Sequence, residues 1–148
     1  MDRTRDIRRE YAYAKLSKAD LAEQPLDQFE SWLDHALANA VPDATAMALA
    51  TADGQGKPSV RIVLLKDFDA DGFVWFSDQR SEKGLALAAN PHAELLFYWR
   101  ELDRQVRIRG PVIRVAEPAA DEYFYSRPEA SQWAAVASEQ SQPIESRA

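Results

Sequence analysis

The spacing of apolar residues predicts one amphipathic helix ahead of a series of strands. One stretch repeats them at the i, i+3, i+4, i+7, i+8 spacing of a single buried helix face: Phe29, Trp32, Leu33, Ala36 and Leu37. Asp27 after Pro25 can cap this helix, and Val41-Pro42-Asp43 ends it. We expect residues 1–24 to form a polar arm with a short helical piece, and residues 25–148 to form one domain.

Further along the chain, apolar runs separated by turn residues predict five strands, at 46–51, 58–65, 73–77, 93–99 and 105–115. In the last of these, Arg107 and Arg109 fall on the face opposite Val106 and Ile108. Helices are expected at 81–89, capped by Ser81, and at 118–126 and 128–137. Antiparallel strands with peripheral helices favour a closed β-barrel with the helices packed outside.

Residues 61–66 place four apolar residues between Arg61 and Lys66, which predicts a buried strand with a cation at each end. Such a strand suits a ligand with a charged end and a flat apolar body, as in a phosphorylated flavin. Charges at strand ends more often simply reach solvent. Since the two cations are five residues apart, a regular strand would point them to opposite faces. Contact of both with one ligand requires a bulge, or a ligand at the edge or end of the strand.

Composition narrows the functional classes. The net charge of −6 makes the chain a poor general binder of nucleic acid, although Arg3, Arg5, Arg8 and Arg9 form a basic opening. That opening can stay solvated or close over an anionic small molecule. The absence of cysteine excludes disulfides, thiolate metal sites and a cysteine nucleophile. No apolar run reaches membrane-spanning length and no signal peptide begins the chain, so a cytoplasmic location is expected.

The stretch from Ser77 to Lys83 combines a strand end, a polar turn and a helix start. Free N–H groups at a helix N-terminus attract anions, and Lys83 in the first turn would add a positive charge. An ordinary capped helix with a surface lysine would have the same sequence. The pattern therefore indicates a candidate anion site without excluding this simpler explanation.

Taken together, these segments resemble the pyridoxamine/pyridoxine 5′-phosphate oxidase family. The matching motifs occur in the family's order: Arg8-Arg9-Glu10-Tyr11, Asp43-Ala44-Thr45-Ala46-Met47, the hexapeptide 61–66, Ser81-Glu82-Lys83-Gly84, Glu101-Leu102-Asp103-Arg104-Gln105-Val106, Tyr123-Phe124-Tyr125-Ser126-Arg127-Pro128, Ser131-Gln132 and Ser138-Glu139-Gln140-Ser141. The resemblance implies a mainly β fold with flanking helices, namely the FMN-binding split β-barrel of Greek-key type. It also implies a homodimer with FMN in the interface.

Carried over residue by residue, the resemblance implies two sets of contacts. Those to FMN would come from Arg61, Ile62, Val63, Leu64, Leu65, Lys66, Phe76, Ser77, Lys83, Gln105, Gln140 and Ser141, the last two reaching across the dimer. Those to the substrate would come from Lys66, Tyr123, Arg127 and Ser131 at its phosphate, and from the covering arm Arg8, Arg9, Glu10 and Tyr11. Because Pro128 interrupts the helix after Arg127, the spacing of four from Tyr123 to Ser131 need not give one helix face.

The implied reaction is oxidation of pyridoxine or pyridoxamine 5′-phosphate by O2 to pyridoxal 5′-phosphate, with hydrogen peroxide released and no obligatory catalytic base. Two departures stand out. Glu82 replaces an arginine that is frequent in the family, and family members continue beyond Ala148 with further strands and site residues. Two alternatives therefore stay open. One is a split-barrel flavin reductase with another substrate, and the other is a catalytically impaired dimer that binds FMN or pyridoxal phosphate.

Overall fold

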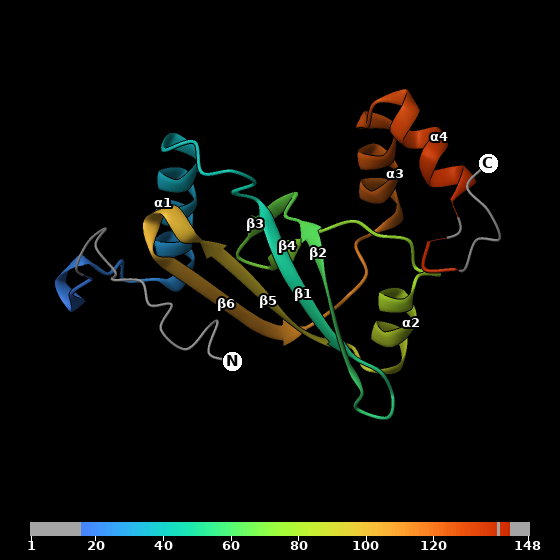
Figure 1. The fold of residues 1–148 in the computed structure, drawn as a ribbon, viewed down its shortest axis with the longest axis horizontal. Coiled ribbons are helices and arrows are strands. Elements are labelled where there is room, and N and C mark those ends of the chain that lie inside the picture. Colours follow the sequence, from blue (N-terminus) through green and yellow to red (C-terminus); the bar gives the residue numbers. More distant parts are fainter. Residues whose placement is uncertain (1–15, 139, 143–148) are drawn as a thin grey trace, which may run out of the picture.

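The computed structural model describes residues 16–138 and 140–142 of the 148-residue chain (Figure 1). The helical elements are η1 (Lys18–Asp20), α1 (Pro25–Ala38), α2 (Glu82–Ala89), η2 (Arg100–Leu102), α3 (Glu117–Ser126) and α4 (Glu129–Ala137). The strands are β1 (Ala46–Ala52), β2 (Pro58–Leu64), β3 (Asp67–Asp69), β4 (Gly72–Val74), β5 (His92–Trp99) and β6 (Arg104–Pro111). The covering arm expected at residues 8–11 lies outside the described residues.

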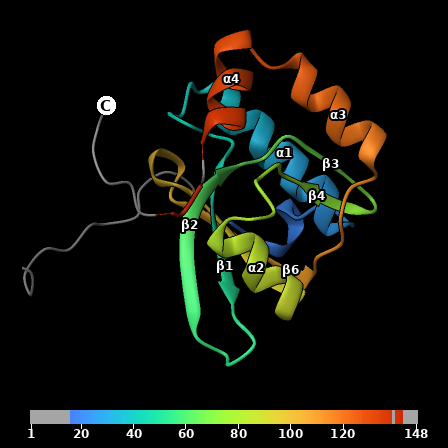
Figure 2. The ribbon, with the colours of Figure 1, turned by 90° about the vertical axis from the view of Figure 1, so that its right-hand side faces the viewer.

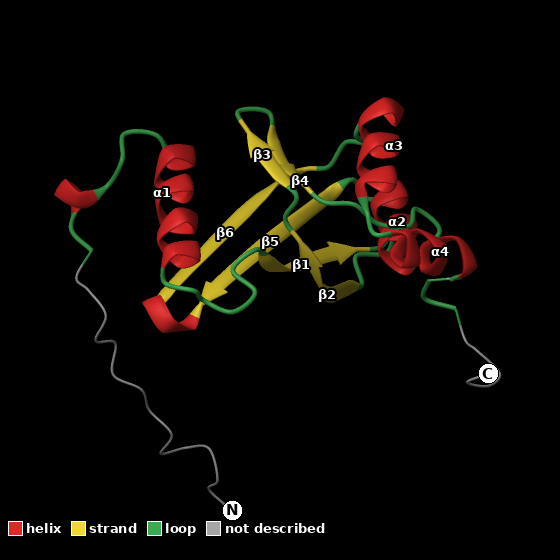
Figure 3. Ribbon diagram, turned by 90° about the horizontal axis from the view of Figure 1, so that it is seen from above, coloured by secondary structure: helices red, strands yellow, loops and turns green. Residues whose placement is uncertain are grey.

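Four of the strands form an antiparallel sheet in the order β2-β1-β5-β6, and β3 and β4 form a separate hairpin. Seen from above, the hairpin lies on one side of this sheet (Figure 3). The register places Leu49 opposite both Arg61 and Leu95, so these three side chains share one face. We call this the inner face, and the opposite one, which carries Ala48 and Ile62, the outer face.

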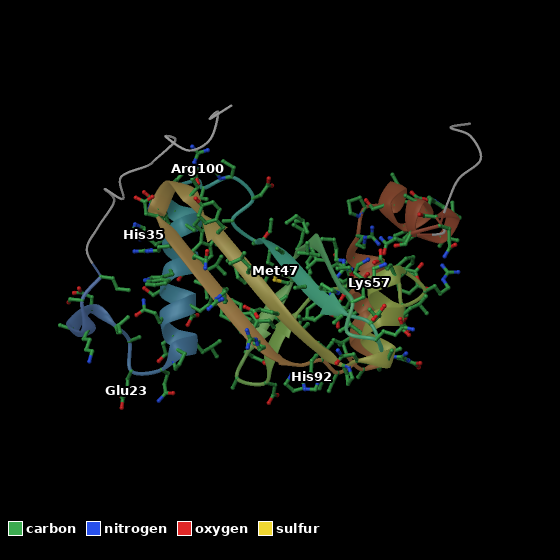
Figure 4. All side chains as sticks on the ribbon, turned by 60° about the horizontal axis from the view of Figure 1, so that its bottom comes forward. Glu23, His35, Met47, Lys57, His92 and Arg100 are labelled. Carbon is green, nitrogen blue, oxygen red and sulfur yellow. The ribbon has the colours of Figure 1, made fainter. Side chains whose placement is uncertain are left out.

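The inner face carries the core because α1 and the β3–β4 hairpin pack over it. The Phe29 ring of α1 lies 5.1 Å from Phe68 and 4.9 Å from Phe73, both in the hairpin. On the other side it lies 5.1 Å from Phe97 of β5, measured between ring centroids. Met47 lies near the middle of the molecule in Figure 4, and it is almost fully buried in this cluster. Sheet, hairpin and helix therefore share one aromatic core.

The outer face is apolar at one edge and is uncovered by any described element. Its exposed apolar residues are Val60, Ile62, Leu64 and Tyr98, which are between 45% and 68% exposed. The alanines of β1 lie between these strands, and Glu94 pairs with Arg109 at the far edge. The prediction of a buried strand at 61–66 is therefore wrong, because β2 is an edge strand on which exposed side chains alternate with half-buried ones.

Other expectations from the sequence are met in part. A mainly β fold with flanking helices is confirmed, but the closed barrel is not: sheet and hairpin are separate hydrogen-bonded units in the described part of the chain. Helix α1 begins at Pro25 with Gln24 as its N-cap, because proline suits the first helical position; Asp27 is not the cap. The strand expected to reach residue 77 ends at Val74, and that expected to reach 115 ends at Pro111.

Helices gather at the two ends of the sheet. Helix α1 lies at one end, and α2, α3 and α4 lie at the other (Figures 1 and 3). Figure 4 labels His35 and Arg100 at the α1 end and Lys57 near α2. Over residues 16–138 and 140–142, no helix is both long and apolar enough to cross a membrane, and no cluster of acidic, histidine or cysteine residues could hold a metal ion.

Candidate functional site

A groove of about 490 Å³ opens at the α2 end of the sheet, beside the edge strand β2. Figure 2 views this end, with β2 and α2 toward the viewer. The groove is lined by Ser59, Val60, Arg61, Ile62, Val63, Leu64, Lys66, Phe76, Ser77, Glu82, Lys83, Tyr123, Gln140 and Ser141. Its volume lies within the range of small-molecule sites, and its lining combines cations with apolar and aromatic side chains.

Arg61 is held against the inner face of the sheet by neutral acceptors. Its Nη1 donates to the carbonyl oxygen of Leu49 at 3.1 Å and to Thr51 Oγ1 at 2.8 Å. Its Nη2 donates to Ser59 Oγ. Within the described residues, Arg61 forms no ion pair with a carboxylate. The guanidinium therefore keeps its full charge available to an anion in the groove.

The chain leaves the sheet immediately after β2, and this brings Lys66 to the same groove as Arg61. Leu65 N–H still donates to Thr45 O of the segment before β1, at 2.9 Å. The next N–H, that of Lys66, donates instead to Val74 O of β4, also at 2.9 Å. This change of partner ends the strict alternation of the strand, which resolves the objection that residues five apart face opposite ways.

The start of α2 is built around Ser81, which is fully buried. Its Oγ donates to Asp78 O at 2.6 Å and accepts from Gly84 N–H at 3.4 Å, as an N-cap does. A Cβ on Gly84 would lie 2.1 Å from the Gln79 carbonyl oxygen, so only glycine allows this approach. Arg80 pairs with Asp78 in the same turn, and its guanidinium lowers the pKa of that carboxyl.

Lys83 lies in the first turn of α2 and is only 8% exposed. Its Nζ donates to Ser81 Oγ at 3.1 Å and to Gln140 Oε1 at 2.7 Å. Burial lowers the pKa of Lys83 below its ordinary value, and the nearby Arg61 charge lowers it further. Both effects destabilise the ammonium form of Lys83. An anion placed between Lys83 and Arg61 would relieve this cost and would therefore bind strongly.

Aromatic residues form another wall of the groove. Tyr123 of α3 stacks on Phe76 with ring centroids 3.8 Å apart and an angle of 6° between the planes. Lys66 Nζ lies 5.7 Å from the centroid of the Tyr123 ring, a cation–π distance. Phe76 and Ser77 follow β4 in a loop, so their side chains are not bound to the alternation of a strand. The groove therefore has a flat aromatic wall next to a third cation.

Several predicted site residues lie elsewhere. Leu65 packs into the core, and Gln105 is exposed on the outer face of β6, beyond β1 and β5 from the groove edge. Arg127 caps the end of α3 in extended conformation, which breaks the helix as Pro128 predicts. Neither Arg127 nor Ser131 lines the groove, whereas Gln140 and Ser141 do so within one chain. The roles of these residues remain predictions.

Sequence reasoning missed two residues that hold Arg61, namely Thr51 and Ser59. Thr51 lies in an apolar alternating strand, where a lone threonine has no signal beyond its β propensity. The register of β1 with β2 pairs Thr51 directly with Ser59, and only this pairing brings both hydroxyls to the guanidinium. Glu82, which departs from the family pattern, is exposed on the groove lining.

These residues fit a phosphorylated flavin. Two cations, the Ser77 hydroxyl and the N-terminus of α2 meet around one part of the groove, which suits a phosphate. The apolar side chains Ile62 and Leu64 and the Phe76 ring offer surface for a flat ring system. Glu82 is the one carboxylate among the lining residues, and its exposure leaves it free to point away from an anion.

Comparison with known proteins decides the family. The family model described as pyridoxamine 5′-phosphate oxidase matches residues 33–148. The chain belongs to this family. Pyridoxine/pyridoxamine 5′-phosphate oxidase from Herminiimonas arsenicoxydans is 50% identical over 97% of this chain, which spans 68% of that protein. Pyridoxine/pyridoxamine 5′-phosphate oxidase 1 from Ralstonia nicotianae is 52% identical, with the same two coverages.

Solved structures agree on the fold. PhzG from Burkholderia lata, solved with tetrahydrophenazine-1-carboxylic acid, has a TM-score of 0.83 and 29% identity, covering 87% of this chain and 64% of its own. An FMN-binding protein from Nostoc punctiforme, related to pyridoxamine 5′-phosphate oxidase, has a TM-score of 0.61 and 22% identity, covering 76% of this chain and 62% of its own. The fold is the FMN-binding split barrel.

Proposed function

We propose that this member of the oxidase family converts pyridoxine or pyridoxamine 5′-phosphate into pyridoxal 5′-phosphate, with O2 as oxidant and hydrogen peroxide as product. The amine route also consumes water and releases ammonia. The observation that carries the proposal is the groove, in which Arg61 and Lys83 converge near an aromatic wall. The names and roughly 50% identity of relatives such as the Herminiimonas arsenicoxydans oxidase support it.

The residues of the groove divide the work of holding the cofactor. FMN, when bound, supplies the two-electron redox chemistry. Arg61, Lys83 and Ser77 would hold its phosphate, because they offer charged and hydroxyl donors around one part of the groove. Ile62 and Leu64 would cover the ring and exclude water on that side. No side chain of the groove needs to act as a general base in this scheme.

The substrate phosphate would lie at Lys66 and Tyr123, whose side chains are already together. Arg127 and Ser131 lie at the elbow between α3 and α4, outside the groove lining. Their proposed contact with the phosphate requires the elbow to approach the groove when substrate binds. This leaves the substrate half of the site less formed than the phosphate end of the cofactor half.

The cofactor assignment is tested by FMN titration, followed through quenching of flavin fluorescence. Arg61→Ala should weaken FMN binding by about ten- to a hundredfold, the usual worth of hydrogen bonds to a charged group. Arg114→Ala is the matched control, because Arg114 is exposed and does not line this groove. Equal losses in the two variants would remove Arg61 from the proposed site.

The activity is tested by O2-dependent formation of pyridoxal 5′-phosphate from each substrate at saturating FMN. Arg127→Ala should raise KM for the phosphorylated substrate, with Arg114→Ala again as control. Turnover of other substrates with no effect at Arg127 would favour a reductase of different specificity. FMN binding without turnover of either B6 phosphate would favour an impaired, binding-only protein.

We also propose that the chain forms a homodimer through the outer face of the sheet. That face presents exposed apolar residues on β2 and β5 around small alanines, with charged residues at its far edge. Gln105, the predicted ring contact, lies on this same face and away from the groove of its own chain. A partner chain would both cover the apolar surface and receive this side chain near its flavin.

Sedimentation velocity tests the dimer. Ala48→Glu puts a carboxylate in the middle of the outer face and should shift the protein to monomer, because an unpaired charge in an apolar interface is costly. Leu37→Glu is the control, since Leu37 is 53% exposed on α1. A wild-type monomer with full FMN affinity would contradict the proposed interface.

A further inference from the structure

Thr51 is one of three buried polar side chains among the described residues, being only 3% exposed on the inner face of β1. Buried hydroxyls need hydrogen-bond partners. Its Oγ1 accepts from Arg61 Nη1 at 2.8 Å and lies 3.3 Å from Ser59 Oγ. Thr51 itself does not line the groove, so it can act on a ligand only through the residue that it holds.

The hydrogen bonds of Arg61 are distributed unevenly over its guanidinium. Nη1 donates to Thr51 Oγ1 at 2.8 Å, to Leu49 O at 3.1 Å and, more weakly, to Ser59 O at 3.4 Å, and Nη2 donates to Ser59 Oγ. Among the described residues, none accepts from Nε. A guanidinium has five N–H groups. The Nε–H and one N–H of Nη2 lie side by side and form a fork that can donate to two oxygens of one anion.

We propose that Thr51 is a positioning residue for phosphate recognition: it holds Arg61 by Nη1, so that the Nε–H and the remaining Nη2–H are left for the phosphate of FMN. This inference rests on the proposed cofactor site. Among the three acceptors of Nη1, Thr51 Oγ1 is the nearest and the only side-chain oxygen. Its bond therefore decides which pair of N–H groups the guanidinium offers to a ligand.

The consequence is selectivity for the phosphorylated flavin. Riboflavin has the same ring system but no phosphate, so it does not use the offered fork. Removing the Thr51 hydroxyl should therefore weaken FMN binding and leave riboflavin binding nearly unchanged. A threonine that served only the packing of β1 would change the affinity for both ligands together, because the ring and the phosphate lie against the same sheet.

The experiment measures dissociation constants of FMN and riboflavin, by fluorescence titration, for the wild type, Thr51→Val and Thr51→Ser. Valine keeps the shape of threonine without its acceptor, and serine keeps the hydroxyl without the methyl. We expect Thr51→Val to lose about tenfold in FMN affinity, comparable to one hydrogen bond to a charged group, and under about twofold for riboflavin. Thr51→Ser should retain the preference for FMN.

A double-mutant cycle identifies the residue through which Thr51 acts. In an Arg61→Ala background, Thr51→Val should have no further effect on FMN affinity, because the guanidinium that it orients is gone. Additive losses would overturn the inference. So would parallel losses of FMN and riboflavin, an unchanged preference in Thr51→Val, or a lost preference in Thr51→Ser. A wild type that binds FMN no better than riboflavin would instead refute the proposed phosphate site itself.

Discussion

The two ends of the molecule are built on different principles. At the α1 end, Phe29 sits in a cluster with Phe68, Phe73 and Phe97, and most of the fully buried side chains lie in or around this core. At the other end, α3 and α4 contain no buried residue, and the groove is lined by cations and half-exposed aromatic rings. One end is packed like a protein interior, and the other keeps surface available.

This difference separates stability from recognition. Burial of aromatic surface supplies most of the free energy of folding, so the α1 end should dominate unfolding measurements. The convergent charges at the α2 end repel each other until an anion arrives, so that end should dominate binding. Substitutions at the α1 end should therefore change mainly the unfolding free energy, and those at the α2 end mainly the affinity for the ligand. A variant with the opposite behaviour would contradict this separation.

The largest effect is expected for Phe29→Ala. Removing this ring leaves a cavity bordered by Phe68, Phe73 and Phe97, and such truncations cost about 3–5 kcal/mol of unfolding free energy. Urea denaturation followed by tryptophan fluorescence measures the loss, with the exposed Leu37→Ala on the same helix as control. A loss below about 1 kcal/mol would show that the core does not depend on α1.

Gly84→Ala should disturb the α2 end more than the fold. Its new methyl group would meet the Gln79 carbonyl oxygen, so the start of α2 must shift away from the turn before it. Overpacking of this kind costs about 1–3 kcal/mol, and we expect an accompanying loss of FMN affinity of at least about tenfold. Leu85→Ala, at an exposed position of the same helix, is the control. Normal FMN binding by Gly84→Ala would separate the helix start from the site.

The pH dependence of FMN binding should report on Lys83. Its pKa in the folded protein lies below the ordinary 10.5, so between the two values the unfolded chain binds more protons and the unfolding free energy rises with pH. An anion favours the ammonium form, so FMN affinity should fall as pH rises through the folded pKa, by at most about tenfold per unit.

Titrations from neutral pH to about pH 10.5, the ordinary lysine value, measure this slope. Lys83→Met should flatten it, and any decline that remains in that variant belongs to the flavin. Lys83→Arg should also flatten it while keeping the affinity closer to wild type, because arginine stays charged throughout. A wild-type slope that persists unchanged in Lys83→Met would rule out Lys83 as its source.

The smallest effect is expected for Trp133→Ser on α4. The Trp133 side chain is 66% exposed, and its Nε1 only reaches Glu129 within the same helix at 3.3 Å. Exposed substitutions usually change stability by less than about 0.5 kcal/mol. A loss above about 1.5 kcal/mol in thermal or urea unfolding would mean that α4 is packed in solution against something that this chain's described residues do not include.

Local patterns in the sequence predicted most of the elements. Helical spacing located α1, the Ser81 cap located α2, and alternation put Arg107 and Ile108 on opposite faces of β6. Strand ends were less predictable, because they depend on which segment becomes the hydrogen-bonding partner. The position of β2 at the sheet edge is likewise set by its neighbours, so its apolar run was misinterpreted as buried.

The candidate site was predictable in its residue types and less so in its assembly. Arg61, Lys66 and Lys83 were identified as candidates from motifs, but their convergence depends on the exit of the chain from the sheet after Leu64. Gln140 reaches Lys83 from 57 residues away, and no local signal contains that contact. Thr51 and Ser59 acquire their function only through the register of two strands.

The exposed row on β2 also matters while the protein is being made. Val60, Ile62 and Leu64 give an unpaired edge strand an apolar side, a combination that recruits further strands and leads to aggregates. A newly folded chain exposes this apolar edge strand until another protein surface covers it. Soluble yield should therefore fall as protein concentration rises during refolding, and a single lysine in place of Val60 should act as a gatekeeper that restores it.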